Sequence, residues 1–250
     1  MNESAINGGS LVDAHCHLDL YSDLERIVSE TEAKHIYTIA VTNAPSVFFH
    51  TAEFTAGRKY VRPALGLHPE LVSSHGHELS HMRDLLKETR YVGEVGLDYQ
   101  TSDLGLRKAQ REVLSCILEW CADYGDKILT LHSRRAASDV TAMVGDGFPG
   151  KAILHWFSGS RKELDQASRI GLYFSVNPAM MRSEKGRSLV TLMPSDRVLT
   201  ETDGPFVKIG KRLAEPADVQ DVVKELASIW NLPVERARER VLKNFGTMLR

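Results

Sequence analysis

Short runs of apolar residues recur along the chain, and a polar stretch with helical periodicity follows most of them. The runs are hydrophobic almost throughout, which is typical of parallel strands buried on both faces of a sheet. We therefore expect a strand in each run. The predicted strands begin at Leu11, His35, Val61, Tyr91, Ile128, Ala152, Leu172 and Val198.

The segments between these runs place apolar residues on one helical face and polar residues on the other. The clearest predicted helices are Asp23–Lys34, Glu78–Thr89, Leu104–Tyr124 and Arg161–Ile170. Ser160 and Glu163 form a capping box at the start of the last of these. A further helix is predicted to begin at Glu215–Pro216, because proline is favoured in the first helical turn.

A strand–helix unit repeated eight times in 250 residues predicts a closed (β/α)8 TIM barrel. The stretch from Leu11 to Arg250 contains no linker-like segment, so we expect a single domain there. Residues 1–10 are rich in Gly, Ser and Asn and lack the basic and apolar regions of a secretory signal. We expect them to form a disordered leader.

Histidines and carboxylates stand where the apolar runs end. These candidate metal ligands are His15, His17, Glu94, His132, His155 and Asp203. Because the carboxyl ends of barrel strands converge on one face, residues far apart in sequence can meet there. Imidazole and carboxylate ligands without thiolate suit zinc or manganese, and magnesium is accommodated where carboxylates and phosphate complete the shell. The sequence therefore predicts a centre for divalent Mg²⁺, Mn²⁺ or Zn²⁺ ions.

Residues of this set differ in the role that we expect. His15 and His17 alternate along a strand and so share one face, although two polar residues capping a strand would show the same pattern. Glu94 has two carboxylate oxygens and could bridge two ions, and its burial without a cation would be costly. The glycines beside Glu94 would let another backbone or a substrate come close. Asp203 is the candidate general base; it could instead serve only as a ligand or cap the following Gly-Pro turn.

Substrate contacts are predicted from weaker signals. Arg134 follows His132 closely and could bind a phosphate, as could His68, which could equally pack beneath the barrel mouth. We expect Trp156 and Phe157 to lie in the core or at the barrel rim, and the His75–His77 segment to be a solvated loop. Basic residues crowd the later loops and together could form a platform for a polyanion. These are Arg161, Lys162, Arg182, Lys185, Arg187, Lys208, Lys211 and Arg212.

Composition limits the classes of function. The formal net charge of −2 gives no global signal for nucleic-acid binding, so a polyanion would need a local patch and metal ions. No apolar run is long enough for a membrane helix, and no membrane partner is expected. Cys16, Cys116 and Cys121 form no even framework, which indicates reduced thiols and a cytoplasmic protein.

Together these residues resemble the TatD family of metal-dependent DNases. The matching stretches run in order along the chain: VDAHCHLDL, ALGLHPEL, YVGEVGLDY, LHSRRA, ILHWFSGS, LTETDGPF and the closing Asn244-Phe245. The resemblance implies a two-metal centre that hydrolyses phosphodiester bonds, commonly as a 3′→5′ exonuclease on single-stranded DNA. It places metal ligands at the six positions named above and phosphate contacts at His68 and Arg134.

The chain departs from the family pattern at a few positions. Gly204 stands where the family usually has Ala, and Trp156 where it often has Cys. The segment FSVNPAMMRSEKGRSLV also differs; with HWFSGS and VLTETDGPF it is similar to the TatD-like nucleases of the Qat antiphage defence system. That similarity implies a role in antiphage defence beside partner subunits.

The resulting hypothesis assigns one ion to His15, His17, Glu94 and Asp203 and a second ion to Glu94, His132 and His155. Two alternatives remain at this stage. One is a metal-dependent hydrolase of a small amide, lactone or phosphotriester, since one barrel hosts many chemistries. The other is a subunit of a defence complex that binds nucleic acid or partner proteins with little catalysis of its own.

Overall fold

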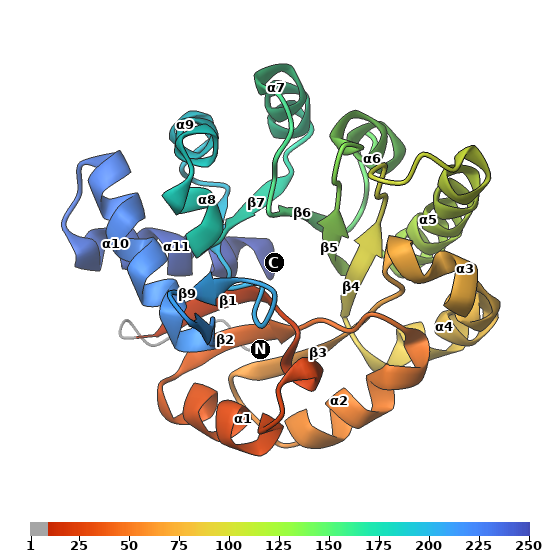
Figure 1. Cartoon of the computed structure of the whole chain (residues 1–250), viewed down its shortest axis with the longest axis horizontal. Coiled ribbons are helices and arrows are strands. Elements are labelled where there is room, and N and C mark those ends of the chain that lie inside the picture. Colours follow the sequence, from red (N-terminus) through yellow and green to blue (C-terminus); the bar gives the residue numbers. More distant parts are fainter. Residues whose placement is uncertain (1–9) are drawn as a thin grey trace.

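Eight parallel strands in sequence order form one curved sheet with helices around it (Figure 1). The computed structural model describes residues 10–250, so positions 1–9 of the expected leader lie outside the described residues. The strands are β1 Leu11–Cys16, β2 Ile36–Ala40, β3 Val61–Leu65, β4 Tyr91–Gly96, β5 Ile128–His132, β6 Lys151–His155, β7 Tyr173–Val176 and β8 Val198–Thr200.

The sheet returns to its first strand just beyond the end of β8. The backbone N–H of Asp203 donates to the carbonyl of His15 (2.9 Å), and the N–H of His17 donates to the carbonyl of Gly204 (2.8 Å). These bonds join the chain after β8 to β1 at the barrel mouth. The predicted single-domain (β/α)8 barrel is thereby confirmed.

Helices follow the strands and cover the outer face of the sheet (Figure 1). They are α1 Leu24–Ala33, α2 Phe48–Thr55, α3 Val72–His75, α4 Leu79–Leu85, α5 Leu104–Tyr124, α6 Ala137–Val144, α7 Arg161–Arg169, α8 Pro178–Arg182, α9 Glu184–Leu192, α10 Val219–Trp230 and α11 Val234–Met248. The predicted helix over Leu104–Tyr124 has the bounds of α5. The helix expected over Glu78–Thr89 divides into α4 and a 3-10 turn.

The prediction of a solvated loop around His75 is wrong. Helix α3 ends at His75, and a 3-10 turn covers Gly76–Glu78. The reason is tertiary: Val72 is buried, and α3 packs against α5, which holds this polar segment in helical turns. His75 and His77 nevertheless belong to none of the groups of potential metal ligands among the described residues.

Helix α11 fastens the end of the chain to the barrel. Phe245 is fully buried, and its ring lies 5.8 Å from that of Tyr37 in β2. The side-chain amide of Asn244 donates to the carbonyls of Ser195 (2.9 Å) and Val198 (2.8 Å), so it fixes the start of β8. The closing Asn-Phe pair therefore has a structural role on the last strand of the barrel.

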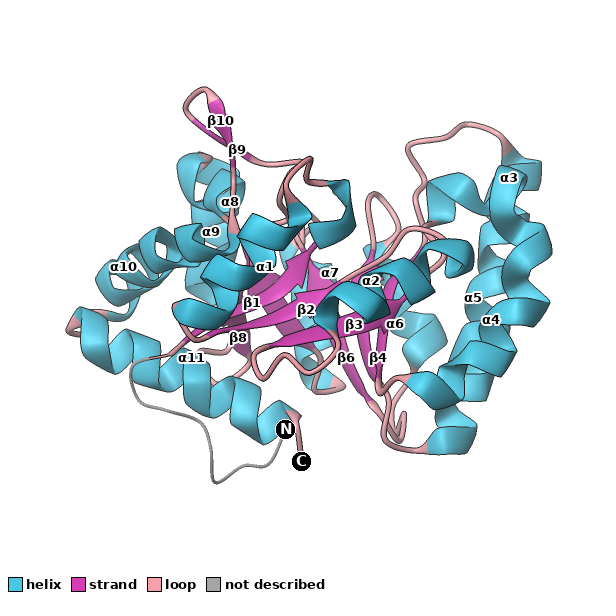
Figure 2. Cartoon of the chain, turned by 90° about the horizontal axis from the view of Figure 1, so that it is seen from below, coloured by secondary structure: helices cyan, strands magenta, loops and turns pink. Residues whose placement is uncertain are grey.

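A short antiparallel hairpin, β9 Lys208–Ile209 and β10 Arg212–Leu213, follows β8 and projects beyond the helices (Figure 2). Both guanidinium nitrogens of Arg212 donate to the carboxylate of Asp218, which ties the hairpin to the turn before α10. The hairpin therefore stands beside the barrel mouth on an anchored base.

Within residues 10–250, no helix combines the length and the apolar character needed to cross a bilayer. The three cysteines are all free, as predicted.

Candidate metal centre

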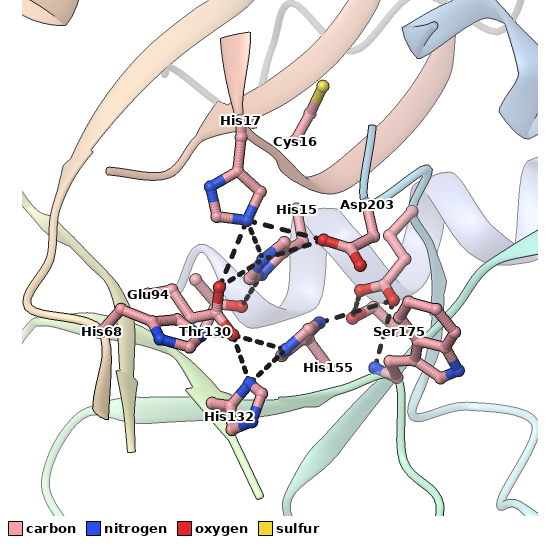
Figure 3. A network of polar contacts seen from close by, with 12 residues as sticks. His15, Cys16, His17, His68, Glu94, Thr130, His132, His155, Ser175 and Asp203 are labelled. Atoms are coloured by element: carbon pink, nitrogen blue, oxygen red, sulfur yellow. Dashed lines mark hydrogen bonds and ion pairs between the residues drawn. The ribbon is translucent and has the colours of Figure 1, made fainter. Parts of the chain in front are cut away.

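The six predicted ligand side chains converge at the mouth of the barrel, around the carboxylate of Glu94 (Figure 3). On one side, Nε2 of His15 and Nε2 of His17 lie 3.4 and 3.2 Å from Oε2 of Glu94. The same two nitrogens lie 3.6 and 3.5 Å from Oδ1 of Asp203. Both imidazoles on the β1 side thus face one oxygen of Glu94 and one oxygen of Asp203.

The other oxygen of Glu94 faces a second group. Its Oε1 lies 2.6 Å from Nδ1 of His132 and 2.8 Å from Nε2 of His155, while these two nitrogens are 3.4 Å apart. A single carboxylate therefore presents one oxygen to each of two groups of imidazoles. This is the arrangement that a bridging ligand between two ions requires.

Distances on the His15 side suit a tetrahedral ion. Ligand atoms bound 2.0–2.1 Å from such an ion lie about 3.3 Å from one another. Nε2 of His15, Nε2 of His17 and Oε2 of Glu94 lie 3.2–3.4 Å from one another. Oδ1 of Asp203 lies 3.5–3.6 Å from the two imidazole nitrogens. These donors could accordingly hold a divalent ion with little rearrangement.

The strand pairing is irregular at the positions of two of these candidate ligands. The pairing of β1 with β2 shifts register between Asp13 and Cys16, and that of β4 with β5 shifts between Val92 and Val95. Irregularities of this kind turn side chains away from the regular alternation of a strand. His15 and Glu94 lie within the two shifts, and Glu94 is inside β4 rather than at its end as the sequence had indicated.

The glycines on either side of Glu94 leave space for the neighbouring strand β5. A Cβ at Gly96 would strike the backbone of His132, and one at Gly93 would strike the side chain of Thr130. Gly96 also has a φ of +145°, which favours glycine. These glycines let β4 and β5 approach closely, which is one of the two roles expected for them.

Two of the imidazoles are oriented by a second polar group. Nδ1 of His15 lies 2.6 Å from the hydroxyl of Thr130, and Nε2 of His132 lies 2.8 Å from Oδ2 of Asp98. Such a contact fixes the ring and leaves the other nitrogen free to bind a metal. Sequence reasoning missed both partners, although Asp98 follows β4 closely enough to have been considered.

Glu201 is a further residue that the sequence analysis missed. Its fully buried carboxylate accepts hydrogen bonds from Ser175 and from Asn177, and lies 3.7 Å from Nδ1 of His155. It also accepts the backbone N–H of Trp156 (3.1 Å). A buried Glu two residues before Asp203 was the available signal. Glu201 positions the segment that carries His155.

Asp203 is placed by its own neighbours. It lies three residues beyond the end of β8, with a φ of +50°. The carboxylate of buried Asp13 accepts from the backbone N–H (2.9 Å) and the hydroxyl (2.6 Å) of Thr202. This clamp between β1 and the segment after β8 sets Asp203 beside His15 and His17.

His68 lies beside Glu94 and presents an N–H group to its carboxylate. Its Nδ1 accepts the backbone N–H of Glu70 (3.2 Å), so the proton of the neutral ring is on Nε2, which lies 3.4 Å from Oε1 of Glu94. A protonated ring nitrogen donates hydrogen bonds and has no free lone pair for an ion. This geometry favours contact with a phosphate oxygen or with water over metal ligation.

The electrostatics of the cluster show how strongly it attracts positive charge. Burial by itself lowers the pKa of His17, but hydrogen bonds with Asp203 and Glu94 outweigh it and raise the pKa to about 9. Burial likewise opposes the charged form of His155, yet Glu94 and Glu201 hold its pKa well above the usual value. Burial would raise the pKa of Glu94, but the surrounding imidazoles bring it well below its ordinary value. Cationic charge is therefore favoured beside this carboxylate.

A cavity of about 570 Å³ opens above the centre. Arg134, which is exposed, lines it together with Trp156 and Phe206. Trp156 lies at the rim, whereas Phe157 is buried in the core. Substrate can therefore reach Glu94 through a mouth that carries both a guanidinium group and aromatic rings.

The expected basic platform is only partly available. Arg212 pairs with Asp218, Arg187 pairs with Glu225, and the Lys185 ammonium donates to the carbonyl of Ser158. The remaining members are exposed and form no ion pair with another described residue. These are Arg161, Lys162, Arg182, Lys208 and Lys211. All five follow strand ends that open toward the mouth.

A steric reason explains why Gly204 stands where the TatD pattern usually has alanine. A Cβ there would collide with the hydroxyl of Tyr21 and with the carbonyl of Ala214. The Tyr21 hydroxyl donates to that same carbonyl and so fills the space that an alanine would need.

Comparison with known proteins identifies the family of this chain. The sequence profile of the TatD related DNase family matches residues 12–250. The chain belongs to this family. It is 27% identical over 256 residues to the uncharacterized metal-dependent hydrolase YcfH of Escherichia coli K12, covering 95% of each chain. It is 25% identical over 257 residues to human deoxyribonuclease TATDN3, covering 95% of this chain and 93% of the relative.

Among solved structures, the barrel resembles the TatD homologue YJJV of Escherichia coli, with a TM-score of 0.83 at 22% identity. The match covers 95% of this chain and 97% of YJJV, so the TatD barrel accounts for nearly the whole molecule. The protein is thus a metal-dependent hydrolase of the TatD family, with candidate His and Glu metal-binding groups at the barrel mouth.

Proposed function

We propose that this TatD protein hydrolyses phosphodiester bonds with a two-metal centre, as a 3′→5′ exonuclease on single-stranded DNA. The proposal rests on the two carboxylate oxygens of Glu94, which face different pairs of histidines. Its Oε2 faces His15 and His17, while its Oε1 faces His132 and His155. The polarity and the single-stranded substrate rest on the resemblance of the motifs to the family.

The proposed site has one ion among His15, His17, Glu94 and Asp203 and a second among Glu94, His132 and His155. When bound, two such ions supply a hydroxide nucleophile at neutral pH and offset charge on the phosphate. The Asp203 carboxylate is the proposed acceptor of a proton from the attacking water, because it lines the cavity beside His15 and His17, which lie within 3.6 Å of its Oδ1.

Two residues are proposed to bind the scissile phosphate. Arg134 lines the cavity and presents a guanidinium group, which matches phosphate oxygens in geometry and charge. His68 directs the protonated Nε2 of its neutral ring toward the Glu94 cluster. The exposed lysines and arginines of the later loops would then attract the rest of the polyanionic strand.

The test uses metal-stripped protein and single-stranded DNA labelled at either end, with Mg²⁺, Mn²⁺ or Zn²⁺ added back singly. We expect stepwise loss of nucleotides from the 3′ end that depends on metal. Asp203→Asn should abolish it while the barrel stays folded, because amide oxygen is a poor proton acceptor. Loss from the 5′ end would contradict the polarity, and internal cuts would contradict exonuclease action.

Glu94→Ala tests the bridging role. We expect turnover to vanish and metal content, measured by mass spectrometry of the purified protein, to fall below that of the wild type. His77→Ala is the matched control, because His77 is an exposed histidine outside every described ligand group. Full nuclease activity in metal-saturated Glu94→Ala protein would refute the bridge.

A small-molecule hydrolase is the rival function, because barrel structures at low identity share only the fold. A panel of uncharged lactones, amides and phosphotriesters distinguishes the two. Turnover of any of these above that of DNA would favour the rival. DNA binding that survives complete chelation, with no cleavage under any metal, would favour a binding subunit instead.

We further propose that the nuclease acts in antiphage defence with partner subunits. The support is the similarity of the segment from Phe174 to Val190 to the Qat nucleases. Phage plating on cells that carry the wild-type system or its Asp203→Asn variant tests this role. Equal plaque numbers on both would contradict it.

A further inference from the structure

Two aromatic side chains, Trp156 and Phe206, line the cavity above the candidate metal centre and are 36% and 59% exposed. We propose that this pair, the aromatic rim, stacks on unpaired nucleobases beside the scissile phosphate and so selects single-stranded DNA. The inference rests on the proposed nuclease function and adds the residues that determine its specificity.

The backbone holds Trp156 in an unusual conformation. Its φ is +39°, in the left-handed region that bulky side chains rarely adopt. The N–H of Trp156 donates to Glu201, whose carboxylate is itself held by Ser175 and Asn177. Strained positions persist where the surrounding structure determines them, and they cluster at functional sites. The network thus fixes the backbone of Trp156 at the mouth, while the next residue, Phe157, is buried.

Both residues lie next to candidate ligands of the centre. Trp156 follows His155, whose Nε2 lies 2.8 Å from Glu94. The Phe206 ring meets that of His17 edge-on, with 4.9 Å between centroids and 87° between planes. The aromatic rim therefore has Phe206 on the His17 side of the centre and Trp156 on the His155 side. A phosphate bound at Glu94 would place its neighbouring nucleosides between these two rings.

The indole of Trp156 is free for such contact. It makes no hydrogen bond, ring contact or cation contact with any other residue in the part of the chain that the structure describes. Aromatic faces stack on every base, and this stacking tolerates changes of sequence. Arg134 lines the same cavity, so an aromatic surface and a phosphate-binding cation stand together. This combination fits a nucleotide better than a small uncharged ester or amide.

Bases in a duplex are already stacked and paired, so they would have to leave the helix before meeting the rim. A single strand offers its bases without that cost. The aromatic rim therefore gives a physical reason for single-strand preference that the metal ligands by themselves do not supply.

The experiment measures binding by fluorescence anisotropy with the metal that supports cleavage. Its probes are a short single strand whose terminal 3′ linkages are phosphorothioates, to slow hydrolysis, and the same strand with abasic sites at its last two 3′ positions. Trp156→Phe and Trp156→Leu place comparable strain on the same backbone, and only the first keeps a ring. Phe49→Leu is the control, because Phe49 is 55% exposed on α2 and does not line the cavity.

We expect Trp156→Leu to bind the base-containing strand roughly 5- to 150-fold more weakly than the wild type, with little change on the abasic strand. Trp156→Phe should retain most of the affinity, and Phe49→Leu all of it. Phe206→Leu should also weaken binding of the base-containing strand alone. The ratio of cleavage rates on single-stranded and duplex DNA should fall in parallel in Trp156→Leu.

Equal losses on both strands, or unchanged affinity in Trp156→Leu and Phe206→Leu, would overturn the inference while leaving the nuclease function intact. A wild-type protein that neither binds nor cleaves DNA with any metal would instead refute the proposed function, and the inference with it. Circular dichroism and thermal melting of each variant show that the barrel is folded.

Discussion

At the scale of single residues, the candidate centre depends on groups that orient its imidazoles. Asp98 binds Nε2 of His132 at 2.8 Å, so Nδ1 of that ring is left facing Glu94. Burial of Asp98 raises its pKa, but the hydrogen bond with His132 outweighs this and lowers the pKa overall. The carboxylate is thus ionised at neutral pH and fixes the ring.

We predict that Asp98→Asn weakens metal binding roughly 10- to 100-fold, because a neutral amide orients and polarises the imidazole less well. Competition of the protein with a chelator of known Zn²⁺ affinity measures the change. Asp139→Asn is the control, since Asp139 pairs with Arg111 on the outer helices. Unchanged affinity in Asp98→Asn would remove this residue from the support of the centre.

At the scale of elements, the last helix and the hairpin each depend on one polar side chain. Asn244 joins α11 to the start of β8 through two hydrogen bonds, and Asp218 joins the hairpin to the turn before α10. Both residues act at a distance from the metal centre. Each should therefore affect stability before it affects catalysis.

Asn244→Ala should lower the free energy of unfolding by about 1–3 kcal/mol, because the carbonyls of Ser195 and Val198 lose their donor. Urea unfolding followed by circular dichroism checks this. Lys243→Ala, an exposed neighbour on the same helix, should change stability little. A loss in Asn244→Ala no larger than in Lys243→Ala would show that the two bonds contribute little.

The ion pair of Asp218 predicts a dependence on pH. Burial raises the pKa of Asp218, but the hydrogen bonds from Arg212 outweigh this and lower it below its ordinary value. A carboxylate with a depressed pKa stabilises the fold above its unfolded pKa of about 3.9, and this stabilisation is lost as the pH falls through the folded value. The free energy of unfolding of the wild type should exceed that of Asp218→Asn by about 1 kcal/mol at pH 7. In denaturation at pH 7, 5 and 3 that difference should persist at pH 5 and shrink at pH 3.

At the scale of the whole molecule, the candidate ligands come from β1 and the residue after it, from β4, β5 and β6, and from the segment after β8. An ion bound among them would join parts of the barrel that are far apart in sequence. Metal binding should therefore be coupled to the stability of the whole barrel and not of one loop.

We predict that chelation lowers the melting temperature of the wild type. Binding to the folded state alone stabilises it by about 2.7 kcal/mol when free metal is 100-fold above the dissociation constant. Calorimetry with and without metal measures the shift, and Glu94→Ala should melt at a temperature that depends far less on metal. A wild-type protein that binds metal yet melts at the same temperature without it would contradict this coupling.

Much of this protein could be predicted from its sequence, because the relevant signals are local. Apolar runs such as that of β5 identify strands, and the alternation of His15 and His17 places both imidazoles on one face. Parallel strand order then brings His132, His155 and Glu94 to the same mouth. The barrel was predicted correctly for this reason, and the six candidate ligands do converge.

Other features were decided only by tertiary structure. The register shifts that aim His15 and Glu94, the second contacts made by Thr130 and Glu201, and the left-handed backbone of Trp156 all involve partners distant in sequence. The same holds for His75, whose polar segment becomes helical because α3 packs on α5. Periodicity specifies which face of an element is buried, but the orientation of a ring or carboxylate depends on what packs against it after folding.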